Sequence, residues 1–144
     1  MNAKNIINLA KNIKKEWQTN DPYAIAEHLG IHVLDNKTCV KGFTAQTIKV
    51  KGYPTIISIN DAYTDFSKKV LCAHELGHAL LHQECVNHFA ITNANVITNV
   101  EQEANLFAIA LLSSEETLDS LTVPLTSMNN YLLKSIMDYN LELK

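Results

Sequence analysis

Three histidines, His74, His78 and His82, recur every four residues in the stretch CAHELGHALLH, which covers residues 72–82. On an α-helix, side chains four residues apart lie about 40° apart around the axis and about 6 Å apart along it. Two imidazoles placed in this way can bind one metal ion, because Zn–N distances are about 2.0–2.1 Å. The stretch therefore predicts a helix that carries a metal site, and the alternative is a surface helix with incidental histidines.

Spacing alone fits His74 with His78 and also His78 with His82. Glu75 follows His74 directly and lies about 60° around the helix from His78, so it flanks the ion without binding it. This is the HExxH arrangement, in which the glutamate takes a proton from metal-bound water. The second pair has Ala79 at the equivalent position, and His82 lies about 12 Å along the axis from His74. We therefore predict His74 and His78 as ligands, Glu75 as the general base and His82 as a flanking residue.

A catalytic zinc site also needs a third protein ligand and leaves one coordination position for water. The downstream candidates are His82, Cys85, His88, Glu101 and Glu103. A Cys2His2 site that uses Cys72, His82, Cys85 and His88 is a poor alternative. Cys72 and His82 are ten residues apart on one predicted helix, about 15 Å in axial rise, which is too far for one ion. Cys72 is better read as a small buried residue.

The predicted helix over about residues 99–112 discriminates between the two glutamates. Thr98 and Glu101 fit a capping box, T-N-V-E, which gives Glu101 a structural role. The apolar face of this helix is formed by Val100, Ala104, Phe107 and Leu111. Glu103 lies about 50° from the centre of that face, and Glu101 about 110°. Because an inward carboxylate needs a cation or a donor, we predict Glu103 as the third ligand, with an ion pair to a lysine as the alternative.

Periodicity and turn residues predict one α+β domain over residues 1–144, with a small sheet covered by helices. Helices are expected over about 3–18, from Asp21–Pro22 to Gly30, from Thr64 through the histidine stretch, over 99–112, from 114, and over 126–141. Strands are expected over 31–35, 43–50 and 55–59, with a hairpin-like turn at Gly52 and Pro54. Residues 83–97 are expected to form a loop.

Composition narrows the classes of protein further. The twelve basic residues are all lysines and the net charge is −3, which disfavours direct nucleic-acid binding because base readout leans on arginine. Three cysteines without a repeating spacing do not form a disulfide framework. A continuous apolar run typical of a signal or a membrane anchor is missing, so we expect a cytoplasmic protein without a membrane partner.

The motifs CAHELGHALLH and EQEANLFAIALL together resemble the ImmA/IrrE family of metallopeptidases, within the gluzincin group of zinc proteases. DPYAIAEHLGIHV and TIISIN resemble the helix and strands that precede the active-site helix, so the resemblance covers roughly residues 20–118. It implies a small zincin-like fold with a short mixed or antiparallel sheet. It also implies one Zn²⁺ with a bound water, held by His74, His78 and the glutamate of the E-A-N segment, Glu103, with Glu75 catalytic. The segments KKVLC and LLSSEETL depart from the usual arginine, phenylalanine and proline, which puts substrate-side contacts in doubt.

By this resemblance the chain would be an intracellular zinc endopeptidase that cleaves a helix-turn-helix repressor of a phage or mobile element. The alternatives are an anti-repressor that sequesters its partner around a structural zinc site, and another hydrolase on the same scaffold. His88 and Tyr63 are both possible oxyanion-stabilising residues, and spacing selects neither. The strand at 55–59 could pair with an extended substrate as edge strands do, or could be an ordinary strand. Gly77, inside the helix, suggests close approach of another backbone.

Overall fold

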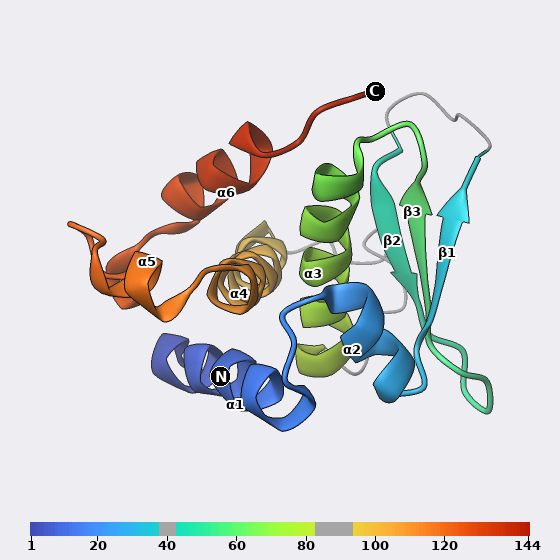
Figure 1. Ribbon diagram of the computed structural model, residues 1–144, viewed down its shortest axis with the longest axis horizontal. Coiled ribbons are helices and arrows are strands. Elements are labelled where there is room, and N and C mark those ends of the chain that lie inside the picture. Colours follow the sequence, from blue (N-terminus) through green and yellow to red (C-terminus); the bar gives the residue numbers. More distant parts are fainter. Residues whose placement is uncertain (38–42, 83–93) are drawn as a thin grey trace.

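The structure is a computed structural model that describes residues 1–37, 43–82 and 94–144, with the backbone alone for 94–98 (Figure 1). Its elements are α1 (Ala3–Trp17), α2 (Pro22–His28), β1 (His32–Asn36), β2 (Ala45–Ile48), β3 (Ile56–Asn60), α3 (Asp65–Leu81), α4 (Ala94–Leu112), α5 (Glu115–Asp119), the 3-10 turn η2 (Leu125–Ser127) and α6 (Asn130–Tyr139). The fold is α+β with a small mixed sheet, as the sequence predicts, and is consistent with a small zincin-like domain.

The sheet has the strand order β1-β3-β2. β1 runs parallel to β3, with Val33 opposite Ile57, and β2 runs antiparallel to β3, with Thr47 opposite Ile57. The turn between β2 and β3 contains Gly52 at φ +88°, so the predicted hairpin is confirmed. β3 is the central strand, which corrects the suggestion that residues 55–59 offer an edge to substrate. The edge strands of the described sheet are β1 and β2.

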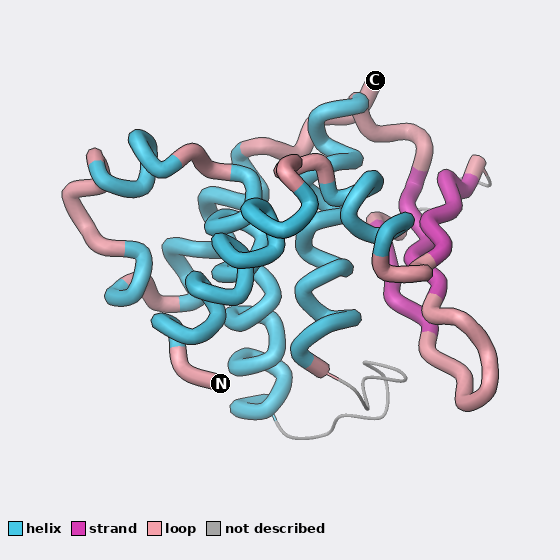
Figure 2. The backbone as a smooth tube through the Cα atoms, turned by 60° about the horizontal axis from the view of Figure 1, so that its bottom comes forward, coloured by secondary structure: helices cyan, strands magenta, loops and turns pink. Residues whose placement is uncertain are grey.

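Helix α3 lies between the sheet and the other helices (Figures 1 and 2). It packs against β2, β3 and α2 on one side and against α4 on the other, while α1 and α6 cover α4. Thr64 caps α3, because its side chain accepts a hydrogen bond from the Ser67 amide at 3.2 Å. Apolar side chains from all of these helices and from β3 join in one core. The predicted metal-binding helix is therefore the central element of the fold.

Gly77 of α3 packs closely against the backbone of α4. A Cβ atom at this position would lie 3.1 Å from the Ala104 Cα atom and 3.2 Å from the Ala104 carbonyl oxygen. These contacts are tighter than ordinary van der Waals contact, so glycine allows the two backbones to pack together. The predicted backbone approach at Gly77 is confirmed.

Helix α4 begins at Ala94, five residues before the predicted start. Residues 94–97, expected in a loop, are helical, and the rest of that expected loop lies outside the described residues. Thr98 and Glu101 therefore stand inside the helix, and the predicted capping box is wrong. Every residue from 104 to 111 is buried, since α4 is covered on several sides. Such a helix has no single inward direction, which matters for the choice of ligand below.

The predicted helix over 126–141 is divided in the structure. Leu125–Ser127 form the turn η2, and α6 begins only at Asn130, because the Asn129 side chain accepts a hydrogen bond from the Leu132 amide at 2.9 Å. The last residues then return along the start of α3. There the Thr64 amide donates to the Glu142 carbonyl oxygen and the Lys144 amide to the Ala62 carbonyl oxygen, each at 2.9 Å. These bonds tie the end of α6 to the body of the protein.

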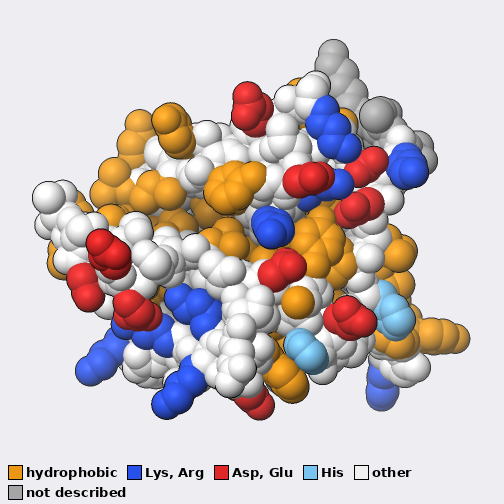
Figure 3. Space-filling view, in the orientation of Figure 1, with side chains coloured by type: hydrophobic (Ala, Val, Ile, Leu, Met, Phe, Trp, Pro, Cys, Tyr) orange, Lys and Arg blue, Asp and Glu red, His pale blue; other side chains and the backbone are white. Residues whose placement is uncertain are grey.

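On the face seen in Figure 3, lysine and acidic side chains lie next to one another, and several lysine side chains gather at the lower left of the view. Within the described ranges, every helix is too short or too polar to cross a membrane.

Candidate metal centre

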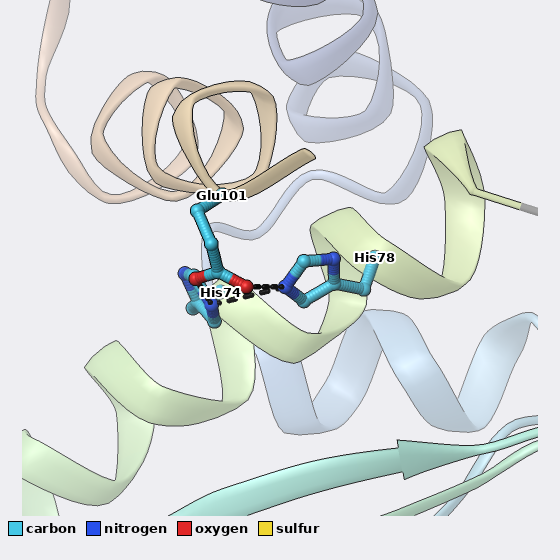
Figure 4. Close-up of side chains that lie close together, drawn as sticks. All are labelled: His74, His78 and Glu101. Carbon is cyan, nitrogen blue, oxygen red and sulfur yellow. Dashed lines mark hydrogen bonds and ion pairs between the residues drawn. The ribbon is translucent and has the colours of Figure 1, made fainter. Parts of the chain in front are cut away.

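His74 and His78 on α3 and Glu101 on α4 bring three lone-pair atoms together (Figure 4). The two histidine Nε2 atoms lie 3.1 Å apart. Glu101 Oε2 lies 3.1 Å from His74 Nε2, and Glu101 Oε1 lies 3.1 Å from His78 Nε2. The two helices thus supply two imidazoles and one carboxylate from opposite sides.

This set of donors fits a zinc ion. Ligand atoms about 2.0–2.1 Å from a tetrahedral ion lie roughly 3.3–3.4 Å from one another. The two Nε2 atoms are 3.1 Å apart and each is 3.1 Å from one Glu101 oxygen, which is close to that spacing. Two histidines and one glutamate are also the protein ligands of several catalytic zinc sites, where a fourth position is left open. The geometry supports the predicted roles of His74 and His78 as ligands.

Glu103 does not face the two histidines, which corrects its predicted position. Its Oε1 atom lies 3.4 Å from His82 Nε2, and its Oε2 atom lies 3.3 Å from the amino group of Met1. The carboxylate that meets His74 and His78 is Glu101, two residues earlier on α4. Glu103 therefore has partners, as predicted, but they are His82 and the amino group of Met1 and not the metal site or a lysine.

The reason for this correction is the environment of α4. We predicted Glu103 on the assumption that one apolar face of the helix is directed at the metal, whereas every residue of α4 from 104 to 111 is buried. Glu101, Ala104, Asn105 and Ala108 follow the i, i+3, i+4, i+7 spacing that forms one stripe, and Ala104 on this stripe contacts Gly77 of α3. Asn105 is the one polar residue in the run 104–112 and lies four residues after Glu101, so this pair is the sequence signal that could have identified Glu101.

The predicted general base, Glu75, lies beside the three ligand atoms. Its Oε2 atom is 3.7 Å from His74 Nε2, and its side chain is only 7% exposed. The Thr47 hydroxyl lies 2.9 Å from Glu75 Oε1 and 3.0 Å from the Glu75 carbonyl oxygen. Thr47 belongs to β2 and was not identified from the sequence. It fixes the orientation of Glu75 from the sheet side.

Each ligand histidine also has a partner at its other ring nitrogen. His74 Nδ1 lies 2.7 Å from Asn105 Oδ1, so Nδ1–H donates and the Nε2 lone pair is directed at the site. His78 Nδ1 lies 3.0 Å from His82 Nδ1. Partners of this kind fix the tautomer and the ring orientation of metal-binding histidines. Asn105, which is 4% exposed, is a second residue that the sequence reasoning missed.

The electrostatics of the cluster favour positive charge between the donor atoms. Burial alone would lower the pKa of His74, but the hydrogen bond to Glu101 and the charge of Glu75 outweigh it, so the pKa is raised. Burial would raise the pKa of Glu101, but hydrogen bonds from His74 and His78 outweigh it and lower the pKa. A divalent cation satisfies the same preference.

Comparison with known proteins bears directly on this site. A sequence model of the Peptidase_M78 family, described as the IrrE N-terminal-like domain, matches residues 26–134. This chain belongs to that family. A relative from Bacillus phage phi105, "Uncharacterized immunity region protein 2", is 30% identical over an alignment of 122 residues, and the match covers 76% of this chain and 75% of the relative. No solved structure matches the chain.

A groove lies beside the cluster, and membership of a peptidase family makes it the candidate substrate site. The groove encloses about 430 Å³ and runs between α3, β2, α4 and α6. His74, Glu75 and Glu101 line one part of it, and Ala45 of β2 and the preceding residue Thr44 line another. The remaining walls carry the apolar side chains Val70, Leu71, Met137 and Leu141 and the polar side chains Asn105, Asn130, Lys134 and Asp138. The groove is therefore lined by two of the three candidate ligands, His74 and Glu101, and by Glu75.

The other residues considered from the sequence lie elsewhere. Tyr63 precedes α3 and pairs with Leu143, and the axial rise from Asp65 to His74 alone is about 14 Å. Tyr63 therefore does not line the groove. Cys72 is fully buried and burial raises the pKa of its thiol, as expected for a small core residue. His88, Cys39 and Cys85 lie outside the described residues.

Proposed function

We propose that this family member is a zinc-dependent endopeptidase whose metal is held by His74, His78 and Glu101. The observation that carries the proposal is the convergence of His74, His78 and Glu101 beside a buried glutamate, Glu75. The two histidine Nε2 atoms lie 3.1 Å apart, and each lies 3.1 Å from one oxygen of the Glu101 carboxylate. Zinc, when bound, supplies a Lewis acid that polarises the scissile carbonyl and lowers the pKa of water toward about 7.

The residues of the chain provide the proton transfers and the positioning. Glu75 accepts a proton from the attacking water and delivers it to the leaving amine, as general acid–base catalysis requires. The Thr47 hydroxyl holds the Glu75 carboxylate on the side of the sheet. Asn105 holds the His74 ring through Nδ1. These contacts place the base and the ligands in one fixed arrangement before substrate arrives.

The groove supports an extended peptide as the substrate. β2 is one of the two edge strands of the described sheet, and Ala45 of β2 and the preceding residue Thr44 line the groove, so a peptide can pair with this strand by main-chain hydrogen bonds. Val70, Leu71, Met137 and Leu141 offer an apolar wall to its side chains. An edge strand and an apolar wall suit an unfolded or locally unfolded segment of a protein.

The proposed substrate is a helix-turn-helix repressor that maintains phage immunity. Two observations support this choice: membership of the peptidase family, and the name of the phi105 relative, which refers to an immunity region. Cleavage of the repressor would relieve repression of the phage or mobile element. The proposed place of action is the cytoplasm, where such a repressor works.

The test compares the wild type with Glu75→Gln on a repressor encoded next to the gene for this chain. The variant keeps the size and the hydrogen bond from Thr47 but removes the base, so cleavage should fall by about 10²–10⁴-fold while zinc remains bound. Cleavage is followed by mass spectrometry, and zinc by metal analysis. Glu27→Gln, an exposed change on α2, is the matched control and should cleave normally.

A chelator should abolish cleavage by the wild type, and added zinc should restore it. If Glu75→Gln relieved repression as fully as the wild type, sequestration of the repressor would replace proteolysis as the function. Cleavage of other proteins but not of any repressor would keep the peptidase and overturn the substrate.

A further inference from the structure

His82 and Glu103 remain outside the three-atom cluster, yet they are connected to it. His82 Nδ1 lies 3.0 Å from His78 Nδ1, and His82 Nε2 lies 3.4 Å from Glu103 Oε1. The three groups therefore form a row from the ligand His78 to a carboxylate on α4. Neither His82 nor Glu103 takes part in the proposed reaction.

The ring nitrogens of this row allow one arrangement of protons when His78 binds metal through Nε2. The His78 proton must then be on Nδ1, which faces His82 Nδ1. His82 Nδ1 must accept this proton in a hydrogen bond, so the proton of a neutral His82 is on Nε2. His82 Nε2–H in turn is directed at Glu103 Oε1. Each donor in the row meets an acceptor.

The surroundings hold His82 in this place. His82 is the C-cap residue of α3, and its amide donates to the His78 carbonyl oxygen at 3.0 Å. Lys49, directly after β2, donates through Nζ to the carbonyl oxygens of Ala79 and His82 at 2.7 and 2.9 Å. The His82 side chain is 11% exposed, that of His78 1% and that of Glu103 23%. Hydrogen bonds in so enclosed a row are stronger than they would be in water.

We propose that His82 and Glu103 are positioning residues for the metal: His82 fixes the ring and tautomer of His78, and Glu103 fixes His82. This inference rests on the proposed metal site. It assigns a role to the third histidine of the CAHELGHALLH stretch and to the glutamate that the sequence had suggested as a ligand. The two ligand histidines then have different supports, since Asn105 holds His74 through an amide.

Neither outer residue is itself a ligand in this arrangement. The ring nitrogen of His82 that faces His78 meets Nδ1, on the opposite side of the His78 ring from the ligand atom Nε2. The other nitrogen of His82 is directed at Glu103. Loss of a positioning residue therefore weakens metal binding without changing the number of protein ligands.

The first measurement is zinc affinity by competition with a chromophoric chelator, which needs no substrate. His82→Ala should weaken binding by about 10–100-fold, the usual effect of losing an outer partner, and Glu103→Gln should weaken it less. The double variant should be close to His82→Ala alone, because Glu103 acts through His82. His82→Gln, whose carbonyl oxygen can accept from His78, should recover part of the affinity. His32→Ala and Glu27→Gln, both exposed, are the matched controls.

The second measurement identifies the mechanism. Cobalt(II) substituted for zinc should give the absorption of a four-coordinate site in both the wild type and His82→Ala. Long-range ¹H–¹⁵N spectra of the zinc-loaded wild type should show His82 with its proton on Nε2. Circular dichroism without metal checks that the variants fold.

Unchanged zinc affinity in folded His82→Ala, or a proton on Nδ1 of His82, would overturn the positioning role. A loss as large as that of Glu101→Ala, with a changed cobalt spectrum, would make His82 a ligand and would overturn it too. Failure of the proposed peptidase is a separate result, since it would leave wild-type zinc affinity and its dependence on His82 as described.

Discussion

The two ends of helix α3 carry clusters of charged groups that differ in where their positive charge comes from. Near the N-terminal end, Lys68 Nζ lies 2.8 Å from Asp61 Oδ1, 3.2 Å from Asp35 Oδ2 and 3.6 Å from Asp65 Oδ1. Toward the C-terminal end, His74, His78 and Glu101 direct lone pairs at one point. The first cluster contains its own cation, and the second is the proposed site of a metal ion.

This difference separates a structural cluster from a functional one. The hydrogen bond to Asp61 outweighs the effect of burial and raises the pKa of Lys68, so the amine stays charged under all ordinary conditions. The Lys68 cluster connects β1, the end of β3 and α3, and its carboxylates are already paired with the Lys68 amine. At the other end, the positive charge between His74, His78 and Glu101 would come from a bound metal ion or from protons on the histidines. Perturbed titrating groups therefore indicate a site only where their charges are not already matched by the chain.

The largest expected effect is at the metal end, where Glu101→Ala is compared with Glu103→Ala. Removal of a ligand should lower zinc affinity by more than the 10–100-fold typical of an outer partner, and removal of Glu103 should stay at or below that range. The measurement is zinc competition with a chelator at fixed pH. Equal effects of the two substitutions, or a larger effect at Glu103, would contradict the ligand set drawn from the structure.

Next in size is Lys68→Met at the other end of α3. The change removes the cation that joins Asp35 and Asp61, so the free energy of unfolding should fall, although both carboxylates remain accessible to water and Asp61 keeps Lys144 as a partner. Urea unfolding measures the loss, and zinc affinity should not change. Lys69→Met, on the exposed side of the same helix, is the matched control and should have little effect. A stable Lys68→Met variant would show that the two ends are less different than the contacts indicate.

The pH dependence of stability follows from the same cluster. Hydrogen bonding to Lys68 outweighs the opposing effect of burial and lowers the pKa of Asp61, so its contribution is present above the unfolded value of about 3.9 and is lost as pH falls through the lower folded value. The pKa of Lys68 is raised, so its contribution is present below the unfolded value of about 10.4 and is lost as pH rises through the folded value. The stability difference between wild type and Lys68→Met should therefore narrow below about pH 4. A constant difference down to pH 2 would contradict the link.

The smallest expected effect is that of Gly77→Ala, between the two clusters. Alanine gains about 1 kcal/mol in helix propensity, but the new methyl group would press on the Ala104 backbone at 3.1–3.2 Å, and overpacking costs about 1–3 kcal/mol. We expect a net loss of about 1 kcal/mol in urea unfolding. Zinc affinity should also fall slightly, because α4 carries Glu101. A gain in stability would show that α4 can move away without loss.

Much of the fold could be predicted because it depends on local chemistry. Thr64 and Asp21 mark the starts of α3 and α2 as caps, and Gly52 marks the hairpin turn. The start of α4 was placed five residues too late, because T-N-V-E has the pattern of a capping box although the chain is already helical from Ala94. The division of the last helix at Asn129 was missed because the apolar pattern continues across the cap.

The site was predicted in part for the same physical reason. His74, Glu75 and His78 lie within five residues on one helix, where helical geometry alone fixes their relative positions. By itself, the sequence determined this half of the site and the family. The tertiary structure decided that Glu101 faces the histidines, that Glu103 meets His82, and that Thr47 and Asn105 hold Glu75 and His74. Those contacts depend on how α4 is rotated against α3, and a helix buried on most sides does not encode that rotation in its own pattern.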